Sequence, residues 1–200
     1  MMKHLEHSNT IYSICESYTI IYRAFRSAAH LWKAKRAKAL SAQFIERIML
    51  AVTEVNGCAA CSYVHARVAL EKGLGEEEIK QLLSGTAEQV PPEQFEAILF
   101  AQHYADMRGN PSKEAWNRIV TTYAQKHAYG ILAATRMMMV GNTYGIAWGA
   151  FVNRLRGLRD SRSSLGYELG MLLTCLPFMI IGGIHALFST ICRQPLLKTT

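Results

Sequence analysis

The chain has 200 residues, half of them hydrophobic, and it carries 22 Lys and Arg against 15 Asp and Glu, for a formal net charge of +7. This length supports one well-buried core, and the hydrophobic share excludes an intrinsically disordered protein. The basic excess comes without interleaved aromatic residues or a nucleic-acid-binding motif, so we predict no nucleic-acid partner.

Helical periodicity dominates from the first clear pattern onward, and no strand-like alternation bounded by turn residues persists, so the predicted fold is all α. A first helix is expected over about residues 11–38, with a break near Ser27 as an alternative. A second helix begins after Ser41, whose hydroxyl suits an N-cap, and ends at Asn56-Gly57. Its apolar face comprises Phe44, Ile48, Ala51, Val52 and Val55.

A third helix follows Gly57 and reaches Gly73, with three residues expected in the core: Val64, Val68 and Leu70. Acidic residues at 76–78 mark the N-terminus of the next helix, because the helix dipole favours negative charge there. Pro91-Pro92 opens another amphipathic helix, which stops at 109–111. Ser112 then begins a helix that contains Trp116, Ile119 and Val120.

The chain becomes markedly more apolar from Ile131 onward, without a flexible linker at the change. We therefore predict a single domain over residues 1–200, with a core at about 40–125 and a C-terminal helical extension at about 131–200. The run Met137 to Met139 is expected to pack in the core or in an oligomer.

The segment from Asn56 to His65 is the most distinctive of the sequence, because it combines Cys58, Cys61 and His65. On a helix that starts after Gly57, spacings of three and four residues place these side chains on one face. Two thiols and a base would then share a small volume. This arrangement suits thiol redox chemistry, in which one sulfur attacks as a thiolate and the other closes a disulfide.

Glu46 is the predicted partner of the histidine. If Asn56-Gly57 is the corner of an antiparallel helix pair, Glu46 lies about ten residues before it and His65 about eight after it, a difference in level of only ~3 Å. A carboxylate that holds an imidazole fixes its tautomer and raises its basicity, and the imidazole can then take the proton of a thiol. The predicted site is therefore Glu46, His65, Cys61 and Cys58.

This spacing resembles the alkylhydroperoxidase D (AhpD)-like branch of the carboxymuconolactone decarboxylase family, over about residues 40–125. The resemblance implies an antiparallel helix pair bearing the CxxC site, a homo-oligomer such as a trimer or hexamer, and reduction of hydroperoxides. It implies Cys61 as the peroxidatic thiol, Cys58 as the resolving thiol, His65 with Glu46 as a proton relay, and an external lipoyl or thioredoxin-like dithiol as reductant. Ala60 departs from the pattern, because the enzyme for which the branch is named has a histidine there; this bears on proton transfer and on the reductant.

Two physical arguments differ over the order of attack. Cys58 lies at the start of its helix, where the dipole favours a thiolate, so it is expected to be the exposed sulfur that exchanges with the external dithiol. Cys61 lies one turn from the base His65, which favours its attack on peroxide. Both hold in one cycle if peroxide oxidises Cys61 to a sulfenic acid and Cys58 condenses with it.

Other interpretations of these residues stay open. A zinc ion would take Cys58, Cys61, His65 and Glu46 as ligands, although structural zinc usually draws its ligands from two separated loops. A second alternative is that the two thiols only pack in the core. A third is that the protein is a non-catalytic helical oligomer or a membrane-associated protein, in which the thiols are structural or sense oxidation. A lactone decarboxylase, like the other branch of the family, needs no cysteine pair. We predict no metal and no cofactor, since the sequence has no nucleotide, haem or flavin signature.

We interpret the remaining carboxylate, histidine and cysteine candidates as structural residues. Glu54 is interpreted as a surface carboxylate at the helix end, and His103 and His127 as structural histidines. Cys15, Cys175 and Cys192 are isolated and are expected to be buried small apolar residues. Five cysteines are an odd number without the spacing of a secreted disulfide framework, and the N-terminal sequence lacks a signal-peptide pattern; both favour a reducing, cytoplasmic location.

Residues 169–192 contain no Asp, Glu, Lys or Arg and are long enough to cross a bilayer as a helix. In that case the basic residues between Arg154 and Arg162 would stay on the cytoplasmic side. Pro177 and Gly182-Gly183 indicate instead a break between packed helices. We therefore favour burial in a homo-oligomer and keep membrane contact through this segment as the alternative.

Overall fold

The computed structural model describes residues 10–197 and 199, and in this part of the chain every regular element is a helix. The elements are α1 (Ile14–Arg36), α2 (Ala42–Asn56), α3 (Ala59–Glu71), α4 (Glu76–Leu82), the 3-10 turn η1 (Pro92–Gln94), α5 (Phe95–Asp106), α6 (Lys113–Leu155) and α7 (Leu165–Ile191). The predicted all-α class and the apolar C-terminal helix are confirmed.

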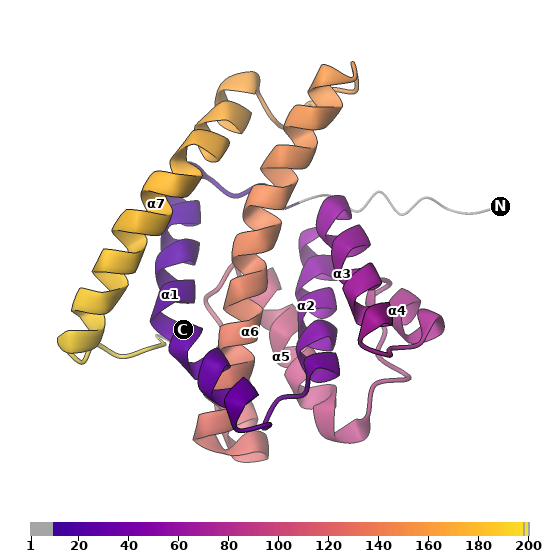
Figure 1. The fold of residues 1–200 in the computed structure, drawn as a ribbon, viewed down its shortest axis with the longest axis vertical. Coiled ribbons are helices and arrows are strands. Elements are labelled where there is room, and N and C mark those ends of the chain that lie inside the picture. The colour runs from indigo at the N-terminus through magenta and orange to yellow at the C-terminus, as the bar shows by residue number, and fades with distance from the viewer. Residues whose placement is uncertain (1–9, 198, 200) are drawn as a thin grey trace.

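Helix α6 forms the axis of the molecule (Figure 1). Helices α1 and α7 lie along one of its sides and pack against each other, while α2 and α5 pack on the other side. Helix α3 doubles back along α2, and its N-terminal end reaches α6. The core therefore lies on both sides of α6, and the turn between α2 and α3 meets its C-terminal half.

Serine caps and one glycine set the boundaries of the early helices. The Ser41 hydroxyl accepts the Phe44 N–H at 3.1 Å, and Gly57 ends α2 with a left-handed φ of 69°. Both predicted boundaries are confirmed. The alternative break near Ser27 is wrong, because α1 is continuous; the buried Ser27 hydroxyl donates to the carbonyls of Arg23 and Ala24 inside the helix.

Helix α3 buries a narrower face than its sequence predicts. Only Cys61 and Ala69 of this helix are buried, whereas Val64 and Leu70 are 52% and 45% exposed and Val68 is half-buried. The predicted core positions Val64 and Leu70 are therefore wrong. The reason is the place of α3 at the edge of the fold, where α2 and α6 pack against one side of it and, among the described segments, the short helix α4 contacts only its C-terminal end (Figure 1).

The apolar C-terminal half of the chain forms two long helices. Ala124, with φ 57° and ψ 156°, interrupts the helical conformation of α6, which is otherwise helical to Leu155. Met138 and Met139 are buried in the core, as expected, but Met137 is 41% exposed.

Helix α7 is unbroken, so the predicted break at Pro177 and Gly182-Gly183 is wrong. Pro177 has no N–H group, so the carbonyl group four residues earlier in the helix lacks its usual donor. Pro177 lies on an exposed face, where water can donate to that carbonyl group instead. Gly182 allows close packing instead, because a Cβ atom there would lie 3.0 Å from Cγ2 of Ile21 on α1. By length and composition alone, α7 could cross a membrane, with a mean hydropathy of 2.0.

Candidate functional site

The two cysteines of the CxxC motif lie at the turn between α2 and α3, where they form a disulfide bond with a Cα–Cα distance of 5.2 Å. Cys58 is the N-cap of α3, in an extended conformation, and its Sγ accepts the Cys61 N–H at 3.3 Å. Gly57 creates this geometry, since its left-handed conformation ends α2 and reverses the chain directly before the cysteine. The sulfurs thus lie at the N-terminus of a helix, where the dipole stabilises a thiolate.

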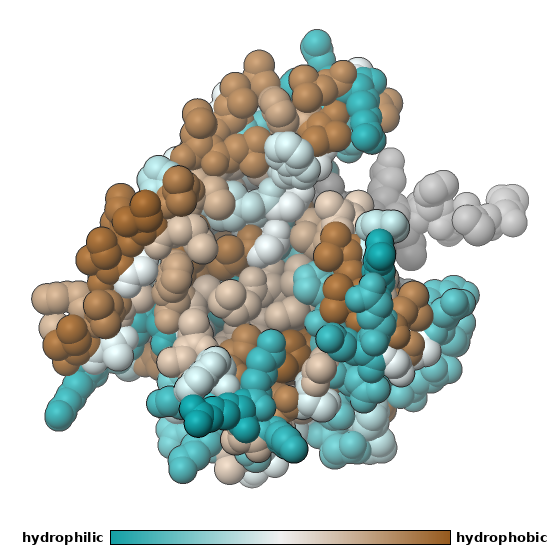
Figure 2. Space-filling model, in the orientation of Figure 1, coloured by the Kyte–Doolittle hydropathy of each residue, from teal (hydrophilic) through white to brown (hydrophobic). Residues whose placement is uncertain are grey.

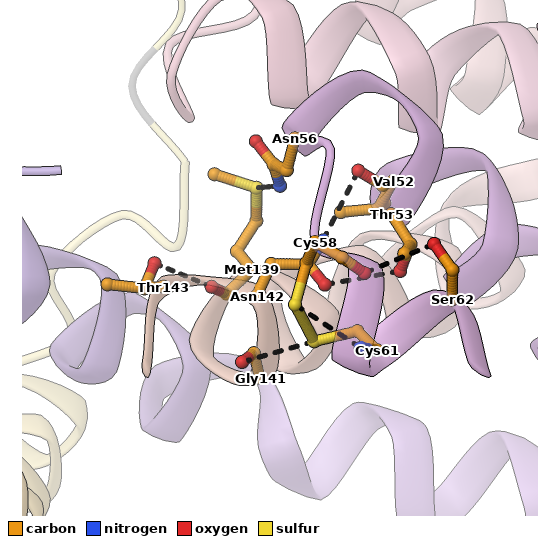
Figure 3. The surroundings of a disulfide bond; sticks show 10 residues. All are labelled: Val52, Thr53, Asn56, Cys58, Cys61, Ser62, Met139, Gly141, Asn142 and Thr143. Carbon is orange, nitrogen blue, oxygen red and sulfur yellow. Dashed lines mark hydrogen bonds between the residues drawn. A yellow bond between two sulfur atoms is a disulfide. The ribbon is translucent and has the colours of Figure 1, made fainter. Parts of the chain in front are cut away.

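The backbone of α6 forms the other wall of the site (Figure 3). The Cys61 Sγ lies 3.6 Å from the Gly141 carbonyl oxygen, which can accept the S–H of the reduced thiol. One turn later, a Cβ atom at Gly145 would lie 2.7 Å from the Cys61 Sγ and 2.8 Å from the Cys58 Sγ. Only glycine at 145 allows the disulfide to pack this closely against the helix.

Asn142 ties the end of α2 to the same stretch of α6. It is fully buried, its Nδ2 donates to the Val52 carbonyl at 3.3 Å, and its Oδ1 accepts from the Thr53 hydroxyl at 3.2 Å. Because these are side-chain bonds inside the core, they fix the level of α2 relative to α6.

Asn56 provides a second link behind the disulfide. Its Oδ1 accepts the Tyr12 hydroxyl at 2.6 Å, and its Nδ2 donates to the Met139 Sδ at 3.4 Å. All three side chains are buried, so the residue that ends α2 is bound both to the segment before α1 and to α6. The turn that carries Cys58 therefore starts from a fixed point.

Glu46 and His65 meet across the α2–α3 pair, as the sequence predicts. The His65 Nδ1 lies 2.9 Å from the Glu46 Oε2, and their side chains are 22% and 11% exposed. A carboxylate at Nδ1 favours the tautomer with its proton on that nitrogen, which leaves Nε2 free to accept a proton. His65 follows Cys61 by one turn of α3, so the base and the thiol project from the same side of this helix.

The two cysteine residues are both buried, but to different degrees. Cys61 is 9% exposed, whereas Cys58 is 1% exposed. The expectation that Cys58 is the exposed sulfur is therefore wrong. As the N-cap of α3, Cys58 has its side chain turned back over the first turn of that helix, where the Cys61 N–H donates to its Sγ.

A small cavity lies next to the CxxC turn, between the first turn of α3 and α6, and its lining includes the neighbours of the cysteines but not the cysteines themselves. Its volume is about 80 Å³. Alanine and glycine residues of α3 and α6 line one part of it, and residues between Asp160 and Tyr167 line the other. The lining includes Ala59, Ala60, Gly145, Gly149, Asn153 and Tyr167. Ala60, the residue before Cys61, lies in the wall of this cavity.

The other candidate residues lie away from this site. The Glu54 carboxylate faces Gly85, where a Cβ atom would lie 3.1 Å from its Oε1. The His103 Nε2 accepts the Ser112 N–H at 3.1 Å, so its predicted structural role is confirmed, whereas His127 is exposed. Among the described residues, no group of three or more His, Cys, Asp and Glu is placed to hold a metal ion.

The three remaining cysteines are more accessible than predicted. Cys15 and Cys192 are exposed and Cys175 is half-buried, so their predicted burial is wrong. Cys15 lies in the first turn of α1 and Cys192 is the C-cap of α7, and helix ends at the surface leave small side chains uncovered. Burial raises the pKa of the Cys175 thiol.

The α6 residues of the site were missed from the sequence, although signals for them exist. Gly141, Gly145 and Gly149 recur every four residues on one face, which indicates close approach of another segment. Asn142 is an amide inside an apolar helix, and such a group must find buried partners. Neither pattern indicates which segment packs against α6. In the structure this segment is the CxxC turn, 80 residues earlier in the chain.

Comparison with known families agrees with the position of this motif. Residues 21–103 match the model of the carboxymuconolactone decarboxylase family. The matched segment contains all four predicted site residues, and it ends before α6. No curated protein and no solved structure matches the chain.

Proposed function

We propose that the protein is a thiol-dependent peroxidase that reduces hydroperoxides through Cys61 and Cys58, as in the AhpD-like branch of the family. The observation that carries the proposal is the 2.9 Å contact between Glu46 and His65, one helical turn from Cys61. A purely structural disulfide needs no base, whereas a reactive thiol depends on its thiolate form.

In the first step the Cys61 thiolate attacks the terminal oxygen of R–OOH. The O–O bond breaks, Cys61 becomes a sulfenic acid, and the departing alkoxide takes a proton and leaves as R–OH. In the second step the Cys58 thiol attacks the Cys61 sulfur, the disulfide forms and water leaves. An external dithiol then reduces the disulfide, is itself oxidised to a disulfide, and returns both cysteines to thiols.

His65 handles the proton in this cycle. With its Nδ1 held by Glu46, the neutral imidazole can take the Cys61 thiol proton at Nε2, directly or through water, and return it to the leaving alkoxide. Glu46 is a positioning residue that also stabilises the imidazolium. The Gly141 carbonyl oxygen, 3.6 Å from the Cys61 Sγ, supports the reduced thiol rather than the thiolate, so deprotonation is the step that needs the base.

Accessibility supports the order of attack. Cys61 is the more exposed of the two residues, so we assign to it the contact with the peroxide and, in the disulfide, with the incoming dithiol. Ala60, next to Cys61, carries no titratable side chain, and His65 is therefore the base that we assign to the thiols. A cytoplasmic location, where dithiol reductants are available, belongs to the same proposal.

A lactone decarboxylase is the second candidate, because the matched family model carries that name. Decarboxylation of a lactone needs acid–base groups and an anion-binding pocket but no thiol pair. Under this alternative Cys61→Ser keeps full activity on the lactone, whereas the peroxidase proposal requires that the same variant lose all peroxide turnover. In a redox-sensing or structural assembly, neither activity is present.

Thiol counting and intact mass after one equivalent of hydroperoxide test the proposal. We expect the reduced protein to lose two thiols and two hydrogens, with Cys58 and Cys61 linked. Cys58→Ser should stop at a sulfenic acid on Cys61 that a sulfenic-acid-specific reagent traps, and Cys61→Ser should not react at the motif. Cys192→Ser, which removes an exposed thiol elsewhere, is the matched control and should behave like wild type. A motif that stays reduced would reject the proposal.

A further inference from the structure

A second cavity lies between α1, α6 and the segment that follows α7. Its volume is about 190 Å³. Three arginines line it, Arg23 and Arg26 from α1 and Arg136 from α6, together with Thr19, Tyr22 and residues 194–197. The lining contains no acidic residue, so every charged residue in it is an arginine.

Arg136 is the deepest of the three, at 2% exposure. Its Nε donates to the Tyr104 hydroxyl at 2.9 Å, and its two terminal nitrogens donate to the carbonyl oxygens of Arg23 at 3.3 Å and Leu196 at 3.2 Å. Every one of these acceptors is neutral.

Arg26 and Arg23 likewise contact only neutral groups. Arg26 donates to the Gln194 carbonyl oxygen at 2.6 Å and to the Tyr22 hydroxyl at 3.4 Å, and its Nε is buried without any hydrogen-bond partner. Arg23 donates to the Gly109 carbonyl oxygen at 2.8 Å and to the side chain of Asn110 at 2.9 Å. Within residues 10–197 and 199, none of the three arginines forms an ion pair with a carboxylate.

The buried Arg136 and the half-buried Arg26 lie near each other without a carboxylate partner, and burial weakens the screening of their charges by water. The same field acts on His30, whose pKa is lowered by burial and then by the charges of Lys33 and Arg136. An anion in the cavity compensates these charges and gives the buried Arg26 Nε an acceptor.

We propose that this cavity binds a small oxyanion of the phosphate class, either free phosphate or the phosphate of a small monoester. A phosphate offers more acceptor oxygens and more negative charge than a single carboxylate, and guanidinium forks match its geometry. The cavity is smaller than the pockets that hold drug-sized ligands, which suits one phosphoryl group. The bound anion would also fix residues 194–197 against α1, since Arg26 and Arg136 already hold that segment.

Isothermal titration of the full chain with inorganic phosphate, at constant ionic strength in a chloride buffer, tests the proposal. We expect saturable binding of one phosphate per chain. Arg26→Gln should weaken it by about tenfold or more, because a charge-assisted hydrogen bond is lost, and Arg26→Lys should weaken it less. Arg159→Gln removes the same charge from an exposed position outside the cavity and should leave binding unchanged.

Acetate is the comparison anion, because it carries a single carboxylate. Methyl phosphate distinguishes a site for free phosphate from a site for a phosphate monoester. Tighter binding of methyl phosphate than of phosphate identifies a monoester site, and equal or weaker binding identifies a site for the free ion. The proposal is overturned if phosphate shows no saturable binding, if acetate binds more tightly, or if Arg26→Gln and Arg159→Gln have equal effects. Circular dichroism of each variant verifies that it is folded before titration.

Discussion

Gly145 brings the disulfide against the backbone of α6, and its missing side chain is a condition of that contact. A Cβ atom there meets both sulfurs at under 3 Å, whereas a Cβ atom at Gly149, one turn later, meets nothing within 4 Å. The oxidised pair is the form that needs this space, because reduced sulfurs can rotate apart. Gly145 is therefore expected to control the redox balance of the motif without taking part in proton transfer.

Gly145→Ala should destabilise the disulfide relative to the dithiol. Overpacking typically costs about 1–3 kcal/mol, which corresponds to a rise of roughly 20–60 mV in the reduction potential of a two-electron couple. Equilibration with dithiothreitol buffers, followed by thiol counting, measures this shift. Gly149→Ala is the matched control and should keep the wild-type potential; an equal potential in Gly145→Ala would show that the close packing has no effect on the motif.

The sequence predicts the Glu46–His65 contact because both residues lie on helices that adjoin one corner. Gly57 fixes that corner, and the helical rise then sets which residues share a level. The contact of the disulfide with Gly145 depends instead on how α6 packs, and local patterns carry no such long-range register. The same limit applies to Val64 and Leu70, whose apolar character predicts burial while the position of α3 at the edge of the fold leaves them exposed.

At the scale of elements, one buried ion pair fixes the turn between α6 and α7. Arg154 donates to both carboxylate oxygens of Glu168, at 2.7 and 2.8 Å, and the Ser163 hydroxyl donates to the same group at 2.6 Å. The Glu168 side chain is fully buried. The hydrogen bond from Arg154 is the largest cause that lowers the pKa of Glu168 below its ordinary value.

Arg154→Met should destabilise the fold at neutral pH, because it leaves the Glu168 carboxylate without its counter-ion. A depressed pKa contributes stability above the ordinary value of 4.5, and this contribution is lost as the pH falls through the lower folded value. The difference between wild type and variant should therefore shrink in acid. Urea unfolding at pH 7 and pH 3 measures it, with the exposed Arg156→Met as control; a difference that grows in acid would contradict the assignment.

The sequence predicts that the segment of α7 is helical, but it does not predict that the helix is continuous. Its apolar composition predicts a helix, but Pro177 and the paired glycines predict a break that is absent. The proline is tolerated on an exposed face, and Gly182 is required by Ile21 of α1. In this helix the proline lies at the surface and the glycine at a contact with another helix, and neither residue breaks the helix. The sequence alone does not distinguish these two roles from a true helix break.

At the scale of the whole molecule, the outer face of α7 is an uncovered apolar stripe (Figure 2). Eight aliphatic residues recur at intervals of three and four, each between 39% and 73% exposed: Leu165, Leu169, Leu173, Leu176, Ile180, Ile184, Leu187 and Ile191. Their exposed area is on the order of 800 Å², which matches one side of a standard stable interface and exceeds the patches typical of monomers.

We expect a second copy of this chain to cover the α7 stripe. The inner face of α7 packs along α1 from Gly170 beside Ile14 to His185, which bonds Tyr18, so lipid cannot surround the helix as it would a lone membrane span. A stripe of leucine and isoleucine at helical spacing is also typical of helix–helix contacts.

Leu173→Glu combined with Ile184→Glu should convert the oligomer to a monomer. Light scattering after size-exclusion chromatography without detergent measures the mass. Leu70→Glu, on the exposed face of α3, is the matched control and should not change it. A wild-type monomer, or a protein that stays in solution only with detergent and binds lipid vesicles through this stripe, would contradict self-association.

The most direct test of the central claim is the single-turnover rate of disulfide formation when the reduced protein meets a hydroperoxide. General-base catalysis typically contributes about 10²–10⁴-fold, so His65→Ala should slow this rate at neutral pH by about a hundredfold or more, and Glu46→Gln by less. The exposed His127→Ala should match wild type. An unchanged rate in His65→Ala, in a folded protein whose Cys58 and Cys61 still form the disulfide, would contradict the proposed relay.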